Sequence, residues 1–289
     1  MKAKSILLIL TVFVLFLLVQ NYRLPESGNT DTPEQSSSEA SIKKAGVYFQ
    51  ETAAVTPEQS GAVIAFTFDD GYLSDYEIAY PILKKYNIRG TSYIIPKYQD
   101  EGRAYAMSWD QVKEMMQYGW VFGCHTYAHT DLKKMSAQDI VSSMKMVNEA
   151  FERQGLEPPV IHAFPFGNYN QQAIDAMKPY RVQMRKAYYE QKFIDLISVN
   201  PYEIDSCSAD MRTEKRLKEH EALVDKACEK NAVLVFRCHC LYRSEVNDMG
   251  EWPVQTDSRL FEQLVAYCVQ KGCRFITMTD LIDMYTPKT

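Results

Sequence analysis

Several features are missing from the 289-residue sequence, and each absence excludes a class of protein. With only 12 glycines, the chain cannot be collagen-like. Its 32 lysines and arginines are scattered among 37 acidic residues, so we expect no nucleic-acid partner bound through a basic surface. The seven cysteines include no C-x-x-C pair and predict no disulfide framework. By contrast, 46% hydrophobic and 12% aromatic residues are enough to build a core, which excludes a disordered chain.

The N-terminus has the pattern of an export signal. Lys2 and Lys4 precede an apolar run over residues 6–19. No pair of small residues for cleavage follows this run, and the lysines before it favour an N-terminus on the inside of the membrane. We predict a signal-anchor helix over residues 1–22, with a cleaved signal peptide as the alternative. The rest of the chain is then extracytoplasmic, either membrane-anchored through this helix or secreted.

The next segment, residues 23–45, has almost no large apolar side chains and consists mainly of Ser, Glu, Thr, Pro, Asn and Gln. Such a segment cannot bury enough surface to offset the entropy lost on ordering, so we expect a disordered tether. The folded domain is expected over residues 46–289. No internal repeat is visible in it.

Short apolar segments alternate with segments of helical spacing along this domain. We expect strands at 62–68, 90–95, 120–124, 161–164, 232–238 and 274–278, and helices at 74–86, 108–117, 136–154, 170–178, 213–230, 257–271 and 279–284. Residues 180–212 are expected to form strands within a long surface connection. This alternation predicts βαβ units and a parallel sheet. About seven such units in one domain predict an α/β fold with a closed or distorted (β/α) barrel.

Polar residues follow several of these strands, where the apolar pattern stops. They are Asp69 and Asp70 after the first strand, His125 and His129 after the third, and His239 after the strand at 232–238. In a parallel α/β barrel the C-terminal strand ends meet at one rim, where such folds carry out their chemistry. The sequence therefore predicts one site that brings these side chains together.

The two histidines suggest a metal. His125 and His129 are four residues apart, so a helical turn would place both rings on one face, where they can bind zinc or a similar cation. A pair of surface histidines is the alternative for this motif taken alone. One carboxylate of Asp69 and Asp70 would complete the site, and the other would be left to act as a base. Adjacent strand residues point to opposite faces, so both acids can serve one site only if the chain turns there, which Gly71 permits.

These residues carry a family resemblance. The segments TFDDG at 67–71 and HTYAH at 125–129 look like the first two motifs of the polysaccharide deacetylases, also called NodB-homology or carbohydrate esterase family 4 proteins. The segment AFPFG at 163–167 resembles the third motif, in the form found in the branch that acts on poly-β-1,6-N-acetylglucosamine. The segment VLVFRCH at 233–239 resembles the fifth. The resemblance runs from about residue 62 to the C-terminus.

The resemblance implies a distorted (β/α) barrel of the NodB type that removes acetyl groups from a glycan with one divalent metal ion, commonly zinc. The roles it implies are Asp69 as general base, His239 as general acid, and Asp70, His125 and His129 as metal ligands. Thr126 would help to fix the metal loop. Pro165, Phe166 and Gly167 would contact the substrate, with the backbone N–H of Phe166 beside the developing oxyanion.

Two positions depart from the family pattern. Ala163 stands where most of the family has an arginine that orients the catalytic aspartate, and Arg237 stands where a leucine is usual. Arg237 and His239 share a face of an extended strand, so our hypothesis is that Arg237 partly replaces the missing arginine as a partner of Asp69 or of the substrate. The fourth motif, an aspartate near a tryptophan, has no clear counterpart, and Asp205 and Asp210 are candidates for it.

The function expected from this pattern is hydrolysis of acetyl groups, N-acetyl in preference to O-acetyl, on an extracellular or cell-wall polysaccharide. An N-acetylglucosamine-containing glycan is the expected partner, and Trp252 is expected to contact it through its ring. The alternative is a non-catalytic glycan-binding domain that keeps the barrel and the metal loop, which the departures at Ala163 and Arg237 suggest.

Overall fold

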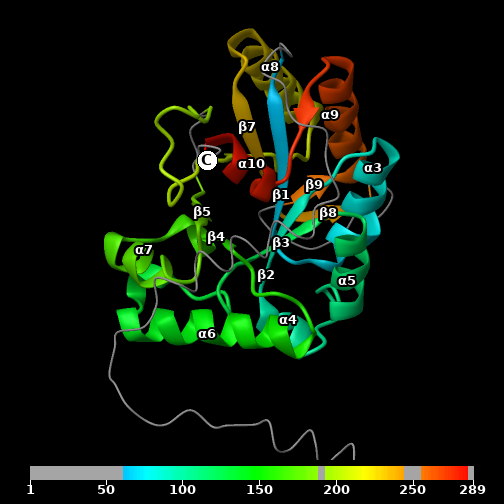
Figure 1. The fold of residues 1–289 in the computed structure, drawn as a ribbon. Coiled ribbons are helices and arrows are strands. Elements are labelled where there is room, and N and C mark those ends of the chain that lie inside the picture. Colours follow the sequence, from blue (N-terminus) through cyan, green and yellow to red (C-terminus); the bar gives the residue numbers. More distant parts are fainter. Residues whose placement is uncertain (1–60, 188–192, 244–254, 286–289) are drawn as a thin grey trace, which may run out of the picture. The chain divides into compact units, whose positions relative to one another are not determined.

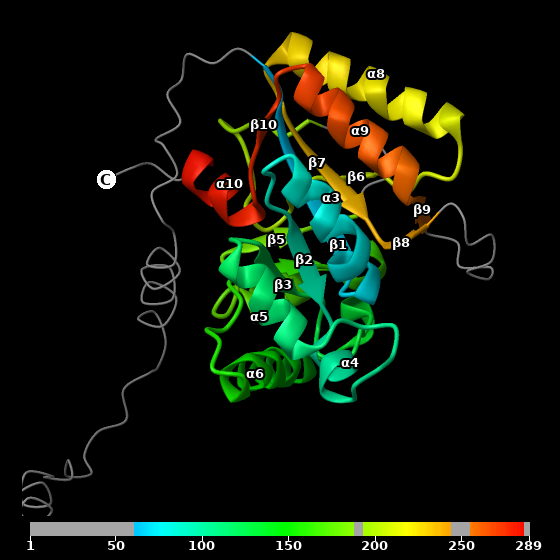
Figure 2. The same cartoon turned by 90° about the vertical axis from the view of Figure 1, so that its right-hand side faces the viewer.

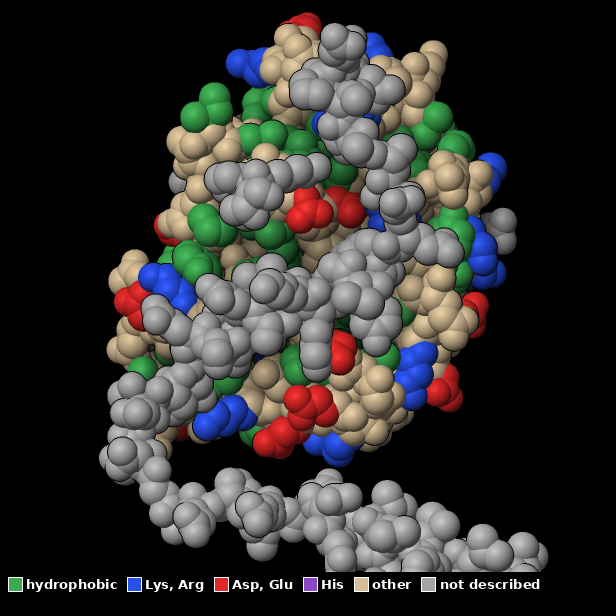
Figure 3. All heavy atoms as spheres, in the orientation of Figure 1, with side chains coloured by type: hydrophobic (Ala, Val, Ile, Leu, Met, Phe, Trp, Pro, Cys, Tyr) green, Lys and Arg blue, Asp and Glu red, His purple; other side chains and the backbone are tan. Residues whose placement is uncertain are grey.

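The computed structural model describes residues 61–187, 193–243 and 255–285 (Figure 1). The expected signal-anchor, the expected tether and Trp252 lie outside these ranges. Within them, the structure has no helix that is both long and apolar enough to cross a membrane. On the face drawn in Figure 3, the Lys and Arg side chains of the described residues are interspersed with acidic ones.

Eight parallel strands form a curled sheet with helices around its outer side (Figures 1 and 2). The strand order is β5-β4-β3-β2-β1-β7-β6, and β10 pairs with β1. The strands are β1 (Val63–Asp70), β2 (Thr91–Ile94), β3 (Val121–Cys124), β4 (Ile161–Ala163), β5 (Gln183–Arg185), β6 (Cys207–Ser208), β7 (Val233–Cys238) and β10 (Arg274–Phe275). A second, two-stranded sheet contains β8 (Cys240–Tyr242) and β9 (Gln255–Asp257). This open, curled parallel sheet confirms the predicted distorted (β/α) barrel.

Each predicted helix has a counterpart in the structure. The helices are η2 (Asp75–Ala79), α3 (Tyr80–Lys85), α4 (Pro96–Asp100), α5 (Trp109–Gln117), η3 (Leu132–Lys134), α6 (Ala137–Arg153), η4 (Pro165–Gly167), α7 (Gln171–Met177), α8 (Glu214–Lys230), α9 (Ser258–Gln270) and α10 (Met278–Tyr285). Side chains that precede the longer helices cap them, for example Ser108 before α5 and Thr213 before α8. The helix expected at 74–86 differs, because it begins as a π-helix, η2, and continues as α3.

The two faces of β1 pack into different clusters. Ile64, Phe66 and Phe68 belong to the cluster between the sheet and the outer helices, whereas Val63 and Ala65 belong to the cluster inside the curl. This explains why the strand is continuously apolar, since both of its faces are buried. Because side chains alternate along a strand, the inner series continues through residue 67 to residue 69. The first acid at the strand end therefore points into the curl.

The segment 180–212 differs most from expectation. The strands expected there are present as the edge strands β5 and β6, but the expected surface connection is wrong, because the side chains of Arg181, Gln183 and Arg185 are all buried. Its strands are only two or three residues long, so their hydrophobic period is too short to predict from sequence. The strand expected at 274–278 is likewise limited to β10, two residues long.

Candidate active site

Three side chains from two strand ends form a candidate metal centre. Oδ1 of Asp70 lies 3.3 Å from Nε2 of His129 and 3.6 Å from Nε2 of His125. Ligand atoms held tetrahedrally at about 2.1 Å from one zinc ion are about 3.4 Å apart, so these three atoms fit a single ion. Among the residues that the structure describes, no other group of three His, Cys, Asp or Glu side chains converges in this way.

The hydrogen bonds around the cluster leave its ligand atoms available. Oδ1 of Asp70 is buried without a hydrogen-bond partner in the described part of the chain, which calls for an ion or a polar ligand there. Nδ1 of His125 lies 2.7 Å from the carbonyl oxygen of Ala163, which can only accept, so Nδ1 carries the proton and Nε2 keeps its lone pair. Burial lowers the pKa of His125 to about 4, so the ring is in the neutral form that binds a metal.

Left-handed backbone conformations shape this part of the site. Asp70, Thr126, His129 and Phe166 account for four of the six non-glycine residues with positive φ in the described ranges, a conformation that costs energy and clusters at functional sites. At Asp70, where φ is 74°, the chain turns as β1 ends, so both adjacent acids face the site, as predicted.

The loop that carries the two histidines is a turn and not the regular helical turn that the spacing predicted. Its φ angles at Thr126 and His129 are 60° and 56°, outside the helical region. The hydroxyl of Thr126 accepts a hydrogen bond of 2.9 Å from the N–H of Thr130, which closes the turn. This contact agrees with the role predicted for Thr126.

Asp69 is held by an arginine that we did not predict. Nη2 of Arg185 lies 2.5 and 2.6 Å from the two carboxylate oxygens of Asp69, and both side chains are buried. Burial alone would raise the pKa of Asp69, but the charge of Arg185, with smaller effects from neighbouring histidines and Arg237, lowers it well below its usual value. Asp69 is therefore an anion at neutral pH.

The position of Arg185 accounts for the absence of an arginine at residue 163. In the register of β4 and β5, Arg185 is the direct partner of Ala163. The guanidinium that the third motif usually supplies thus comes from the neighbouring strand, at the same level of the sheet. The first half of our hypothesis, that Arg237 pairs with Asp69, is wrong as to hydrogen bonding, since the hydrogen bonds come from Arg185 and Arg237 acts on Asp69 only through its charge. The second half, a contact of Arg237 with the substrate, stays a prediction.

His239 is paired with a second carboxylate. Its Nδ1 lies 3.2 Å from Oδ2 of Asp210, and its backbone N–H donates to Oδ1 of Asp210 at 3.1 Å. Burial lowers the pKa of His239, but the hydrogen bond and the charge of Asp210 outweigh burial and raise this pKa above its ordinary value. Of the two candidates for the fourth motif, Asp210 is therefore the partner of His239, whereas Asp205 pairs with Lys186 at 3.3 Å.

The acid and base candidates face each other across the site. Nε2 of His239 lies 3.9 Å from Oδ2 of Asp69, a residue that also lies next to Asp70 in the chain. A carboxylate whose pKa is lowered and an imidazole whose pKa is raised are thus side by side, next to the candidate metal centre. Pairs of groups whose pKa values are pushed apart in this way are typical of acid–base catalysis.

The third-motif segment forms a wall of the site. Pro165–Gly167 is the short 3-10 turn η4, and the ring of Phe166 lies 4.4 Å from the ring of His129. The side chain of Phe166 is 61% exposed, although it is large and apolar, so it is available to a ligand. At Gly167, where φ is 68°, an added Cβ would lie 2.9 Å from Cβ of Ala187, and glycine is needed there.

Most of the predicted site residues are brought together. Of the two residues that hold the proposed base and acid, Arg185 was not predicted and Asp210 was one of two candidates. Asp69, Asp70, His125, His129 and His239 converge as expected, with Phe166 beside them. Arg185 was missed, although a buried carboxylate without an arginine at residue 163 requires a cation from elsewhere. Trp252 lies outside the described residues, so its predicted contact with a glycan stays a prediction.

Comparisons with known proteins find similar sequences over part of the chain. Residues 56–184 match the family model for polysaccharide deacetylase. The chain is 33% identical over 121 residues to YxkH of Bacillus subtilis, a protein named for the same family, covering 42% of this chain and 43% of that protein. It is 29% identical over 123 residues to the poly-beta-1,6-N-acetyl-D-glucosamine N-deacetylase of Staphylococcus aureus, covering 38% and 42%. These matches span less than half of either relative.

The fold is also found in solved structures. The chitin deacetylase of the fungus Colletotrichum lindemuthianum superposes with a TM-score of 0.55 at 17% identity, over 76% of this chain and 86% of that one. At 17% sequence identity, this structural similarity is evidence for a shared fold only. Fold and site together define a NodB-type (β/α) barrel with a carboxylate–histidine centre at its strand ends. Over residues 56–184, the chain is similar to the polysaccharide deacetylase family.

Proposed function

We propose that this chain is a metal-dependent hydrolase that removes N-acetyl groups from a polysaccharide. The observation that carries the proposal is the arrangement around Asp69. Its carboxylate, ionised through Arg185, lies 3.9 Å from a histidine whose pKa is raised, and both lie beside three convergent metal-ligand side chains. Amide hydrolysis needs these elements, because a water must lose a proton and a poor leaving group must gain one.

Asp70, His125 and His129 would hold the divalent ion. When bound there, the ion supplies electrophilic activation of the acetyl carbonyl. The neutral form of His125, which leaves a ring nitrogen lone pair available, and the buried, unpartnered oxygen of Asp70 support this assignment. Imidazole and carboxylate together suit zinc, which is the metal we expect.

Asp69 is assigned the role of base. It takes a proton from the water that attacks the acetyl carbon, and the hydrogen bonds from Arg185 fix its carboxylate in one orientation. The low pKa of Asp69 keeps it able to accept a proton over a wide pH range, at the expense of basicity.

His239 is assigned the role of acid. As the carbon–nitrogen bond breaks, it donates its Nε2 proton to the leaving nitrogen, so that acetate and a free amine are released. Its raised pKa, to which the hydrogen bond and charge of Asp210 contribute most against burial, supports this role because the ring then holds its proton to higher pH than an ordinary histidine does. A leaving amine requires that proton more than a leaving alcohol does, which favours an N-acetyl substrate. The named activity of the Staphylococcus aureus relative points the same way.

The site of action proposed is outside the cytoplasm. The pattern of lysines and apolar residues at 1–22 supports export, either as a membrane anchor or as a cleaved signal. To test this location, a tag is placed at the C-terminus and protease is added to intact cells. We expect the protease to remove the tag. A tag that becomes accessible only after lysis would contradict this location.

The test of the activity is acetate release by the purified full-length chain loaded with zinc. Substrates are N-acetylglucosamine oligomers with β-1,4 and β-1,6 links, peptidoglycan and acetylated xylan. We expect the chain to release acetate from an N-acetylated glycan and Asp69→Asn to lose this activity. The control is Asp175→Asn, which removes an exposed carboxylate on α7 and should release acetate as the wild-type chain does. The alternative, a glycan-binding domain, predicts binding to these oligomers with no acetate release by any variant.

A further inference from the structure

Three of the seven cysteines lie close together, away from the proposed active site. Cys228 is in the last turn of α8, Cys268 is in α9, and Cys273 lies between α9 and β10. Sγ of Cys228 lies 3.8 Å from Sγ of Cys273, although the two residues are 45 apart in the sequence. All seven cysteines fall within the described ranges as free thiols. At this contact two of these thiols face each other.

The elements that carry the two thiols are held together by hydrogen bonds. Helices α8 and α9 lie side by side in Figure 2, and the hydroxyl of Tyr267 on α9 donates to both carboxylate oxygens of Asp225 on α8 at 2.9 Å. Directly after Cys273, the N–H of Arg274 donates to the carbonyl of Ala62 at 2.9 Å, which joins β10 to the beginning of β1. The two thiols therefore face each other across a gap whose width is fixed by the fold.

This gap is small enough for a disulfide to close. The sulfur atoms of a disulfide are about 2.0 Å apart, so the two Sγ atoms must approach by about 1.8 Å. Rotation of both side chains about their Cα–Cβ bonds can supply such a shift. Cys228 is partly exposed and Cys273 keeps 8% of its surface accessible, so a small reagent can reach the pair.

The two thiols differ in their readiness to react. A hydrogen bond from Cys268 outweighs burial and lowers the pKa of Cys273 to about 7, with smaller contributions from Cys228 and from the charge of Lys271. Burial has the opposite effect on Cys228 and raises its pKa. Because the thiolate is the attacking species in thiol–disulfide exchange, Cys273 is suited to react first and Cys228 to react second.

We propose that Cys228 and Cys273 form a reversible disulfide that joins the end of α8 to the beginning of β10. The thiolate of Cys273 attacks one sulfur of a small-molecule disulfide of the glutathione type, and one small thiol leaves. Cys228 then loses its proton to solvent and attacks the sulfur of Cys273, which displaces the second small thiol. Two protein thiols are thereby oxidised, and one small disulfide is reduced to two thiols. Outside the cytoplasm, where we propose that the chain acts, such protein disulfides persist.

The expected consequence is a more stable fold. The cross-link would close a chain segment of 45 residues and restrict the unfolded state, so the Tm should rise by about 4–15 °C. The contact lies near Ala62 at the beginning of β1, whereas Asp69 lies about 20 Å away at the other end of this strand. The disulfide therefore joins no catalytic group, and this inference is independent of the proposed function.

The test uses the purified full-length chain incubated with oxidised glutathione. Remaining thiols are alkylated, the peptides are mapped by mass spectrometry, and the Tm is measured before and after addition of dithiothreitol. We expect a cross-linked peptide that contains Cys228 and Cys273, and a Tm about 4–15 °C higher that returns to the starting value with dithiothreitol. Cys228→Ser and Cys273→Ser should each lose both signals. Because Cys228 is partly exposed, a serine hydroxyl there remains accessible to water and the fold is retained.

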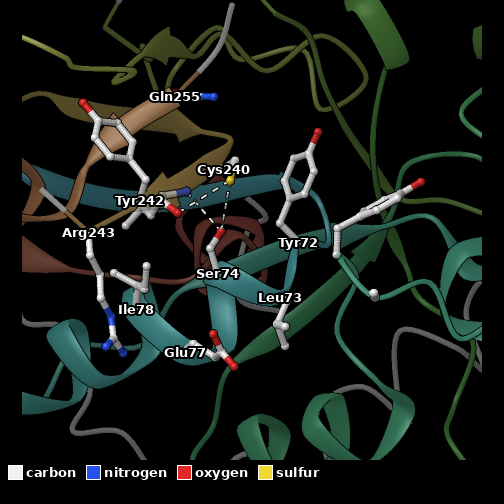
Figure 4. Close-up of a pocket in the computed structure, with 12 residues that line it drawn as sticks. Tyr72, Leu73, Ser74, Glu77, Ile78, Cys240, Tyr242, Arg243 and Gln255 are labelled. Carbon is white, nitrogen blue, oxygen red and sulfur yellow. Dashed lines mark hydrogen bonds between the residues drawn. The ribbon is translucent and has the colours of Figure 1, made fainter. Parts of the chain in front are cut away.

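Cys240→Ser is the matched control. Cys240 is 8% exposed, as Cys273 is, but its thiol accepts a hydrogen bond from the hydroxyl of Ser74 at 3.8 Å (Figure 4). This variant should form the cross-link and show the rise in Tm as the wild-type chain does. The proposal is overturned if both thiols of the wild-type chain stay free, if either keeps an attached glutathione, or if the cross-link joins other cysteines. A rise in Tm that dithiothreitol reverses in Cys228→Ser would also overturn it.

Discussion

The candidate metal centre and the proposed acid–base pairs are built in different ways. Asp70, His125 and His129 come from two short motifs, and the two histidines belong to a single turn. The acid and base depend on partners from distant parts of the chain, since Asp69 is held by Arg185, 116 residues away, and His239 by Asp210, 29 residues away. The proposed metal ligands are thus specified locally, whereas the pKa values of the proposed acid and base are specified by the arrangement of the sheet.

This difference implies that the two parts can be disabled separately. Loss of a ligand should remove the metal and leave the fold intact, because the cluster lies at strand ends and His129 is partly exposed. Loss of a partner in an acid–base pair should leave the metal in place but change the pH dependence or the stability. Four substitutions, ordered by the expected size of their effect, test this separation.

The largest effect is expected from His129→Ala. It removes one of three ligands, so zinc affinity should fall by more than the roughly 10–100-fold that loss of an outer partner causes, and acetate release should fall to background. Zinc content after dialysis and acetate release are the measurements. His129→Cys, which still offers a ligand, should retain more zinc than His129→Ala. Equal zinc content in wild type and His129→Ala would show that the ion binds elsewhere.

The next largest effect is expected from Arg185→Ala. Removing one partner of a buried ion pair should lower the free energy of unfolding by about 3–5 kcal/mol. Burial of Asp69 is then no longer offset, so its pKa rises and the acidic limb of the pH–rate profile should move to higher pH. Lys186→Ala, next in the chain but partly exposed and paired with Asp205, is the control and should cost only about 0–1 kcal/mol.

A relocated arginine sharpens this prediction. Because Ala163 and Arg185 are register partners, Ala163→Arg in the Arg185→Ala background should return a guanidinium to Asp69 from the neighbouring strand. The acidic limb should move back toward that of wild type. If Arg185→Ala leaves the acidic limb in place, Asp69 is not the group that this arginine controls.

A smaller effect is expected from Asp210→Asn. A hydrogen bond to a charged group contributes about 1.5–3 kcal/mol, so turnover should fall by about 10–100-fold at most. His239 has a raised pKa and acts as a protonated acid, so activity is lost as the pH rises through that pKa. Without the charge of Asp210 the pKa falls, and the alkaline limb should move to lower pH. An unchanged alkaline limb, measured as kcat against pH, would contradict the assignment of His239.

The smallest effect is expected from Arg237→Ala. Arg237 lowers the pKa of Asp69 only through its charge, as the last of the contributions, and its Nε is buried without a hydrogen-bond partner among the described residues. Turnover should therefore fall less than in Arg185→Ala, and the acidic limb should move in the same direction but by less. A larger loss of turnover than in Arg185→Ala would contradict this expectation and would support the hypothesis that Arg237 replaces the missing arginine as the partner of Asp69 or of the substrate.

The sequence predicts the local part of this molecule well. Most strands and helices, the turn at Gly71 and the five convergent side chains follow from apolar periodicity and from polar residues at strand ends, which depend on near neighbours in the chain. Arg185 could not be predicted, because its strand is three residues long and its role depends on β5 lying beside β4. Asp210 stayed undecided against Asp205 for the same reason, since only the pairing of β6 with β7 brings its segment next to His239.

The central claim is that Asp69 and His239 together hydrolyse an N-acetyl group. The most direct measurement is the amount of acetate and of new free amine formed from an N-acetylglucosamine hexamer by the zinc-loaded full-length chain. We predict equal amounts of both products, and a fall of about 10²–10⁴-fold in Asp69→Asn at unchanged zinc content. The account would be contradicted if the wild-type chain, with both zinc and the hexamer bound, formed no more acetate and no more free amine than Asp69→Asn does.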